Sequence, residues 1–176
     1  MLNFCSLYSG SSGNSLLVET ENTKLLVDAG VSSRKIENAL NDINIDPSSI
    51  DAILITHEHS DHVQGLGTFS KKFDLPVFVN QETLDAMPKQ RDKIADKNIN
   101  KFNLKDTFDI GIITILFDVS IGSPIIVFTS IISCILFIAV VIRPSIGCSL
   151  IFITFPFFIY YTYCIYNMYH FYFKYT

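Results

Sequence analysis

Three of the chain's four histidines lie within six consecutive residues, in the segment Thr-His-Glu-His-Ser-Asp-His at positions 56–62. Imidazole and carboxylate groups are the usual protein ligands of borderline divalent cations such as Zn²⁺. In an extended chain successive side chains alternate, so His57, His59 and Asp61 project to one side, and His62 can turn in from the following helix. The spacing therefore predicts a metal site made by His57, His59, Asp61 and His62. The alternative is a solvated polar loop that contains histidines by chance.

The elements on either side of this segment favour the metal site. Residues 50–55 form a nearly continuous apolar run rich in isoleucine, which predicts a strand buried between two layers and ending just before His57. A short helix is expected after the motif, although Gly65 and Gly67 weaken its start. Small residues there would let a substrate come close to the metal.

Asp28 follows a third strand-like segment, residues 24–27, and is close to Gly30. Its carboxylate could accept backbone or imidazole N–H groups and so hold the histidine loop in place. Between the first two predicted strands, residues 9–15 form a loop rich in Gly and Ser. The loop could bring exposed amides to a phosphate or substrate, or it could be a plain hairpin turn, and both readings stay open.

Helices are predicted between these strands. Ser33 is a plausible N-cap, and apolar residues at helical spacing follow it: Ile36, Ala39, Leu40 and Ile43. Asn80 is expected to cap a helix that runs through Met87, and residues 88–97 form a charged helix or lid.

Basic side chains are concentrated in that charged segment, at Lys89, Arg91, Lys93 and Lys97. They are the best candidates for a basic patch. Asp92 and Asp96 are interleaved with them, which favours an ordinary exposed face instead. A net charge of −4 offers no general attraction to nucleic acid, so such a contact would need a local patch.

The pattern His57-x-His59-x-Asp61-His62 after an apolar strand resembles the signature of the metallo-β-lactamase-fold hydrolases. Leu26-Val27-Asp28-Ala29-Gly30 resembles the strand-end aspartate and glycine of that superfamily, and Ser9–Ser15 is similar to the first hairpin of its WalJ-type (VicX, YycJ) branch. The resemblance covers about residues 1–109. It implies an α/β fold, the first half of an αββα sandwich. Because the matching aspartate in the family is mostly an organiser, Asp28 is not counted as a ligand.

The resemblance also implies a chemistry, the hydrolysis of a substrate by a metal-activated water. Two divalent cations are expected per complete site, Zn²⁺ first and Mn²⁺ or Fe²⁺ as alternatives, with His57 and His59 on one cation and Asp61 and His62 on the other. Asp61 would also be catalytic, by orienting the water and taking up its proton. The WalJ-type branch points to DNA as partner and to exonuclease-like phosphodiester hydrolysis. Hydrolysis of a small ester or thioester is the enzymatic alternative.

Two metal ions need more ligands than these four residues provide. Residues 117–124 resemble the place where the family carries its next His-Asp pair, but Ile121 and Gly122 stand there. His170 lies among aromatic residues, far from any matching motif, and is not expected to be a ligand. A chain with this incomplete set is expected to be impaired, and a non-catalytic remnant, truncated or tethered to a membrane, is the alternative from another class.

The chain is expected to divide at Asp109, because residues 110–176 differ sharply from what precedes them. This tail has 67 residues, of which 33 are Ile, Phe or Tyr and only three are charged. The uncharged stretches 125–142 and 145–167 are long enough to cross a bilayer as a helical hairpin. Because these amino acids have AT-rich codons, a shift of reading frame between Asp109 and Ile121 is the other hypothesis for the tail, and the one we favour.

The remaining signals concern location. The four cysteines form no CxxC pair, so neither a disulfide framework nor a zinc-thiolate site is expected. The N-terminus has no basic stretch followed by an apolar run. We therefore expect a cytoplasmic protein, with membrane association through the tail as the alternative.

Overall fold

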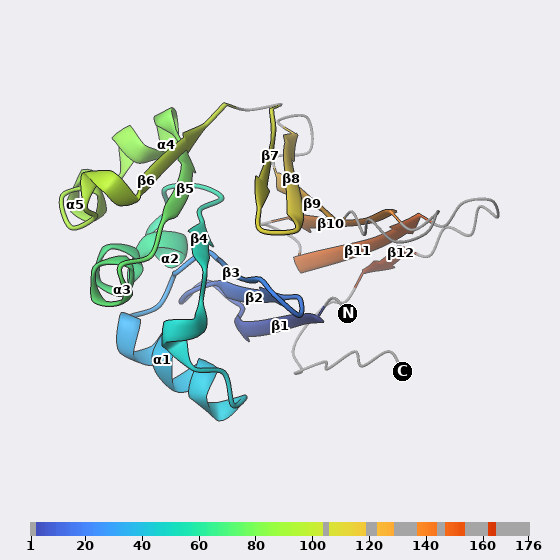
Figure 1. Cartoon of the computed structure of the whole chain (residues 1–176), viewed down its shortest axis with the longest axis horizontal. Coiled ribbons are helices and arrows are strands. Elements are labelled where there is room, and N and C mark those ends of the chain that lie inside the picture. The colour runs from blue at the N-terminus through green and yellow to red at the C-terminus, as the bar shows by residue number, and fades with distance from the viewer. Residues whose placement is uncertain are drawn as a thin grey trace. The chain divides into compact units, whose positions relative to one another are not determined.

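The computed structural model describes residues 3–103, 106–118, 123–128, 137–143, 147–153 and 162–164, with side chains described as far as residue 115. These residues form two compact units that divide between Phe102 and Asn103, and each unit is described by itself (Figure 1).

The first unit contains a six-stranded sheet in which the strands follow their order in the chain, β1 to β6. Strands β1 to β3 pair antiparallel, whereas β3 to β6 are parallel. The strands are β1 (Asn3–Tyr8), β2 (Ser15–Glu19), β3 (Lys24–Val27), β4 (Ala52–Leu54), β5 (Val77–Asn80) and β6 (Ile99–Phe102).

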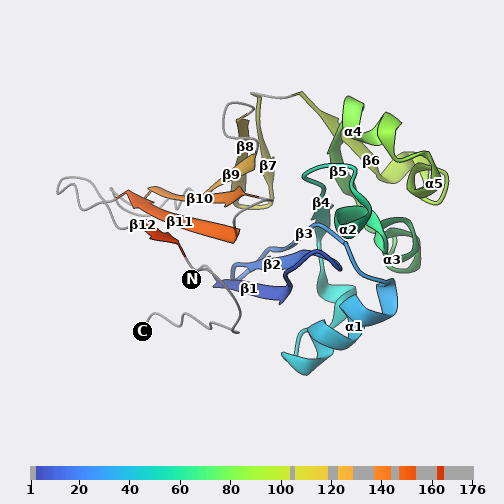
Figure 2. The same cartoon turned by 180° about the vertical axis from the view of Figure 1, so that it is seen from behind.

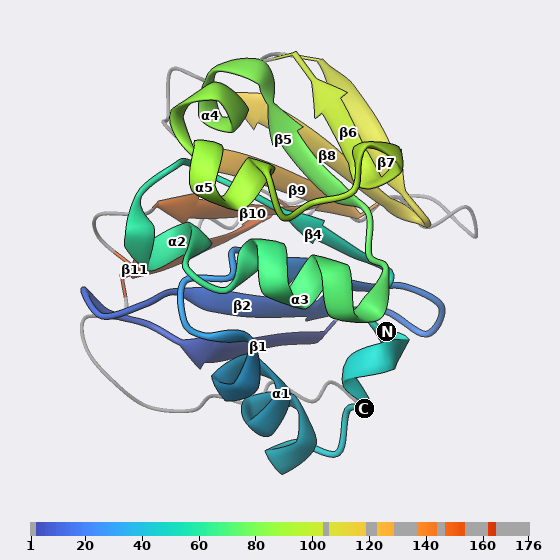
Figure 3. The same ribbon diagram turned by 90° about the vertical axis from the view of Figure 1, so that its left-hand side faces the viewer.

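Helices connect the parallel strands. They are α1 (Ser33–Asp42), α2 (Ser60–Val63), α3 (Leu66–Phe73), α4 (Gln81–Ala86) and α5 (Pro88–Arg91), with 3-10 turns at Pro47–Ser49 and Asp96–Asn98. Crossovers between parallel strands are right-handed, and this sheet grows in one direction, so its connecting helices fall on the same face. Figures 2 and 3 show this helical layer over the sheet. The predicted α/β fold is confirmed at this level.

Apolar side chains fill the space between the sheet and its helices. Strand β4 is buried along its whole length. Ile36 and Leu40 of α1, and Leu66 and Phe69 of α3, are fully buried against the strands. Strands β3 and β4 are paired in parallel from Leu25↔Ala52 to Val27↔Leu54. This pairing places their carboxyl ends beside each other.

Two predicted helix starts had different outcomes. Asn80 caps α4 as expected, since its Oδ1 accepts a hydrogen bond from the Thr83 amide at 2.8 Å. Ser33 is not the N-cap of α1. That position belongs to Ser32, and the Ser33 hydroxyl instead donates to Glu37 Oε1 at 2.9 Å, one turn along the helix.

The second unit, taken by itself, contains a six-stranded antiparallel sheet, β7 to β12 in chain order. Its strands are β7 (Thr107–Ile110), β8 (Ile113–Asp118), β9 (Ser123–Phe128), β10 (Phe137–Arg143), β11 (Gly147–Ile153) and β12 (Thr162–Cys164).

The structure describes only parts of the stretches 125–142 and 145–167, and the helical hairpin predicted there stays a prediction. The parts of both stretches that the structure describes are strands, as their β-branched residues favour. Among the described residues, no helix combines the length and the apolar character needed to cross a membrane. Ile121, Gly122 and His170 lie outside the described residues. The boundary at Asp109 and the change of reading frame stay predictions.

Candidate metal centre

The carboxyl ends of β3 and β4 place Asp28 beside the histidine segment. Neighbouring parallel strands end at the same edge of a sheet, and functional residues collect there. The Asp28 amide donates to the Leu54 carbonyl at 2.9 Å, which continues the strand pairing by one step. After β4 the chain continues to Thr56 and His57, and Thr56 lies beside Asp28, the residue that directly follows β3.

Asp28 is an organising residue, as predicted. It is buried, with 4% of its surface exposed, and its carboxylate accepts three hydrogen bonds. The Thr56 amide donates to Oδ1 at 2.9 Å, the Thr56 hydroxyl donates to Oδ2 at 2.8 Å, and His62 Nδ1 lies 2.8 Å from Oδ2. Its backbone has φ of +62°, a left-handed conformation that Asp adopts more readily than most residues.

The three imidazoles of the motif lie together. The ring centroids of His57 and His62 are 3.9 Å apart, and those of His57 and His59 are 4.7 Å apart. His62 is buried and His57 is half-buried, whereas the His59 side chain is 70% exposed. The structure therefore brings the sequence-predicted residues to one place at the edge of the sheet.

The pKa values of the two imidazoles nearest Asp28 are shifted in opposite directions. Burial lowers the pKa of His57, and the neighbouring His62 lowers it further. Burial acts in the same direction on His62, but the hydrogen bond and charge of Asp28, with the charge of Asp61, outweigh it and raise the pKa of His62.

Asp61 and His62 have the spacing of two ligands of one cation. His62 Nε2 and Asp61 Oδ2 are 3.5 Å apart. Two ligand atoms at about 2.1 Å from a tetrahedral cation are about 3.4 Å apart, so the donor pair fits a divalent metal. Within the part of the chain whose side chains are described, no three His, Cys, Asp or Glu residues are arranged to hold a single ion.

Asn14 contacts the same pair of residues, and sequence reasoning missed it. Its Nδ2 lies 3.2 Å from Asp61 Oδ2 and 3.1 Å from His62 Nε2, and its backbone amide donates to the Asp61 carbonyl at 2.7 Å. The Gly/Ser-rich loop is thus docked on the histidine segment. The signal available in the sequence was a polar residue, Asn14, at the end of this loop and directly before β2.

Gly30 is required by this packing. A Cβ at Gly30 would lie 1.7 Å from the Asp61 carbonyl oxygen and 2.5 Å from the Asn14 amide, so no other residue fits without a backbone shift.

Gly65 and Gly67 were expected to make room for substrate, and their surroundings show a different role. A Cβ at Gly65 would meet the Val31 carbonyl at 2.1 Å, and one at Gly67 would meet Lys93 Cβ at 2.6 Å. Both glycines allow close packing within the protein.

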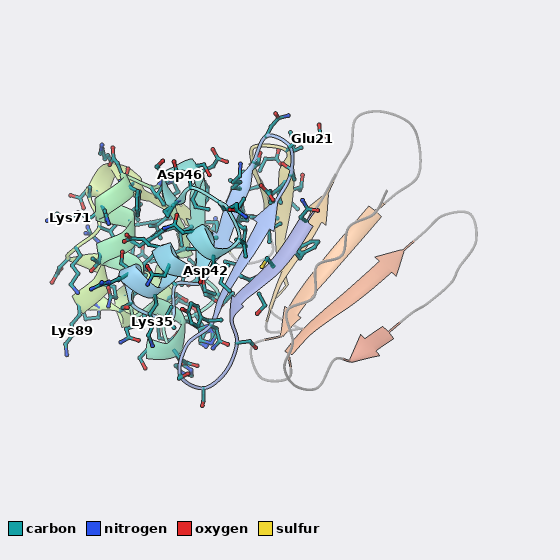
Figure 4. The ribbon with its side chains drawn as sticks, turned by 90° about the horizontal axis from the view of Figure 1, so that it is seen from below. Glu21, Lys35, Asp42, Asp46, Lys71 and Lys89 are labelled. Carbon is teal, nitrogen blue, oxygen red and sulfur yellow. The ribbon has the colours of Figure 1, made fainter. Side chains whose placement is uncertain are left out.

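Two of the four residues of the candidate basic patch are paired with carboxylates. Arg91 pairs with Asp96 and Lys97 pairs with Asp74, each at 2.6 Å. Lys71 and Lys89 point outward from the helical layer (Figure 4). This part of the surface therefore resembles an ordinary exposed helix face, the alternative that the interleaved acidic residues favoured.

Comparisons with known proteins find relatives that match part of the chain. The chain is 44% identical to the exodeoxyribonuclease WalJ of Streptococcus pneumoniae over 111 residues, which are 62% of this chain and 41% of that protein. It is 48% identical to the exodeoxyribonuclease YycJ of Bacillus anthracis over 86 residues, 49% of this chain and 33% of the relative. The chain thus spans less than half the length of these relatives.

A solved structure supports the fold. The FEZ-1 metallo-beta-lactamase of Legionella gormanii superposes with a TM-score of 0.57 at 15% identity, covering 76% of this chain and 58% of that protein. The sequence model of the metallo-beta-lactamase superfamily matches residues 8–127, a span that contains Asp28 and the whole histidine segment. The chain therefore belongs to the metallo-beta-lactamase superfamily.

Proposed function

We propose that this chain carries part of the active site of a metal-dependent hydrolase that cleaves phosphodiester bonds in DNA from an end. One observation supports it most: a buried carboxylate, Asp28, holds the histidine segment at the sheet edge, where Asp61 and His62 have the spacing of adjacent metal ligands. Support for DNA as substrate comes from the names of the relatives, which are exodeoxyribonucleases.

The proposed ligands divide between two cations. His57 and His59 would hold one, and Asp61 and His62 the other, with Zn²⁺ as the first candidate. When bound, such cations lower the pKa of a coordinated water and polarise the oxygen of the scissile bond. Asp61 would orient the water and accept its proton. The remaining ligands must come from water or from residues outside the described side chains.

Metal content and DNA degradation test the proposal together. We expect the purified full chain to take up Zn²⁺, and to degrade end-labelled DNA more slowly than a full-length relative, because Ile121 and Gly122 stand where the family carries its next His-Asp pair. Nitrophenyl acetate serves as the generic ester control. Turnover of the ester in preference to DNA would contradict the proposed substrate.

Two variants separate metal ligation from folding. His59 is mostly exposed, so His59→Ala should leave the thermal unfolding midpoint of the metal-free chain unchanged while it lowers Zn²⁺ content and activity. Glu58→Gln is the matched control, because Glu58 is adjacent and only 40% exposed but is not a proposed ligand. Loss of Zn²⁺ in Glu58→Gln with full retention in His59→Ala would refute the proposed ligand set.

A further inference from the structure

Thr56 is the residue at which the buried run meets the first histidine of the motif, and its hydroxyl has three polar neighbours. Oγ1 lies 2.8 Å from Asp28 Oδ2, 2.9 Å from His57 Nδ1 and 3.4 Å from His62 Nδ1. Thr56 is only 7% exposed, so water competes little for these contacts. The direction of each hydrogen bond therefore depends on which of these neighbours can donate a hydrogen and which can only accept one.

The hydroxyl has one hydrogen, and Asp28 takes it. A carboxylate has no hydrogen to give, so the 2.8 Å contact between the two oxygens is a hydrogen bond only if Thr56 donates. With its hydrogen committed, Thr56 Oγ1 can act only as an acceptor toward His57. The 2.9 Å contact to His57 Nδ1 then requires that Nδ1 carries the hydrogen.

This assignment determines which nitrogen of His57 can bind a metal. A neutral imidazole has one N–H and one lone pair, so a hydrogen on Nδ1 leaves the lone pair on Nε2. The same carboxylate oxygen of Asp28 accepts directly from His62 Nδ1 at 2.8 Å, which leaves the His62 lone pair on Nε2 as well. One carboxylate would thus orient two imidazoles, one directly and one through Thr56.

We propose that Thr56 is a positioning residue. Its hydroxyl donates to Asp28 and accepts from His57 Nδ1, and this relay fixes the His57 tautomer that leaves Nε2 free to bind a cation. Only the purpose of the relay, which is metal binding, rests on the proposed function. The tautomer itself is a property of the chain without metal. Partners of this kind, one shell beyond the ligands, orient metal-binding histidines in many proteins.

The tautomers can be measured directly in the full chain. Long-range ¹H–¹⁵N correlation spectra, recorded with a chelator present and at a pH where both imidazoles are neutral, distinguish the protonated from the unprotonated ring nitrogen. In the unmodified protein we expect the hydrogen on Nδ1 of both His57 and His62. Thr56→Val removes the hydroxyl at nearly constant volume, and His57 should then shift to the Nε2–H tautomer that a histidine side chain prefers in water.

Two controls make the result specific. Thr56→Ser keeps the hydroxyl and should restore the original His57 tautomer. His62 should keep its hydrogen on Nδ1 in both variants, because it contacts Asp28 directly, and this signal also reports that the sheet edge is intact. An Nε2–H tautomer for His57 in the unmodified protein, or an unchanged tautomer in Thr56→Val, would overturn the assignment.

Zn²⁺ titration connects the relay to metal binding. We expect Thr56→Val to weaken Zn²⁺ binding by about tenfold, the lower end of the effects that such partners have, and Thr56→Ser to stay close to the unmodified protein. Equal Zn²⁺ affinity of Thr56→Val and the unmodified chain would refute a role in metal binding. Should the unmodified chain take up no Zn²⁺, the proposed function fails, and the tautomer spectra still decide whether Thr56 relays.

Discussion

Replacing Asp28 by Asn tests how much the buried carboxylate stabilises the histidine segment. The change keeps the shape, and Asn tolerates the left-handed φ of +62°. Its Oδ1 can still accept from the Thr56 amide, but an NH₂ group replaces Oδ2 and faces Thr56 Oγ1 and His62 Nδ1, both now 2.8 Å from Oδ2. Two hydrogen bonds to a charged acceptor are therefore lost or reversed.

The magnitude follows from these contacts. Each hydrogen bond to a charged group contributes about 1.5–3 kcal/mol, and rotation of the hydroxyl or a change of His62 tautomer can recover part of the loss. We expect Asp28→Asn to lower the free energy of unfolding by about 3–4 kcal/mol, a large share of the roughly 5–15 kcal/mol of a typical domain. Asp28→Ala should cost about 1 kcal/mol more, because alanine is less tolerant of the left-handed conformation.

Urea denaturation of the metal-free chain, followed by circular dichroism, measures these differences. Asp51→Asn is the matched control. Asp51 also accepts a backbone hydrogen bond, from the Lys24 amide at 2.7 Å, but it is exposed, so water can replace the lost contact and we expect a change of about 0.5–1 kcal/mol. If Asp28→Asn destabilises the protein no more than Asp51→Asn does, the organising role assigned to Asp28 is wrong.

Three further predictions concern the scaffold of the site. Gly30→Ala should lower the free energy of unfolding by about 3 kcal/mol or more, because its Cβ would overlap the Asp61 carbonyl; a near-neutral urea midpoint would contradict this contact. Glu37→Gln should cost about 0.5 kcal/mol at pH 7, since the hydrogen bond from the half-exposed Lys72 lowers the pKa of Glu37 below its ordinary 4.5. That stabilisation is present above pH 4.5 and is lost as the pH falls through the lowered pKa, so the difference between the two proteins should shrink as the pH is lowered below 4.5, and a difference that does not change with pH would exclude the ion pair as its source. Asn80→Ala should cost about 1 kcal/mol through loss of the α4 cap, whereas Asn80→Ser should retain most of the stability, and equal losses in both would show that the cap contributes nothing.

Local patterns in the sequence were sufficient for much of the first unit. The apolar run before His57, the spacing of Ile36 and Leu40, and the cap at Asn80 each depend on near neighbours in the chain, and each forms the expected element. The organising role of Asp28 was also predictable, since a polar residue at the end of a buried strand needs partners. Ser33 shows the limit of such reasoning, because the helix begins one residue earlier and the adjacent Ser32 takes the N-cap position.

Contacts between distant segments were decided only by the tertiary structure. The Asn14 side chain meets Asp61 and His62 across 47 and 48 positions of the chain, and nothing in the local sequence of the Gly/Ser-rich loop specifies that partner. The roles of Gly65 and Gly67 were misjudged for the same reason, because the atoms that exclude a side chain come from other elements. Types and spacing of residues determine which groups can bind a cation, but hydrogen-bond directions and close approaches depend on which strand ends the sheet brings together.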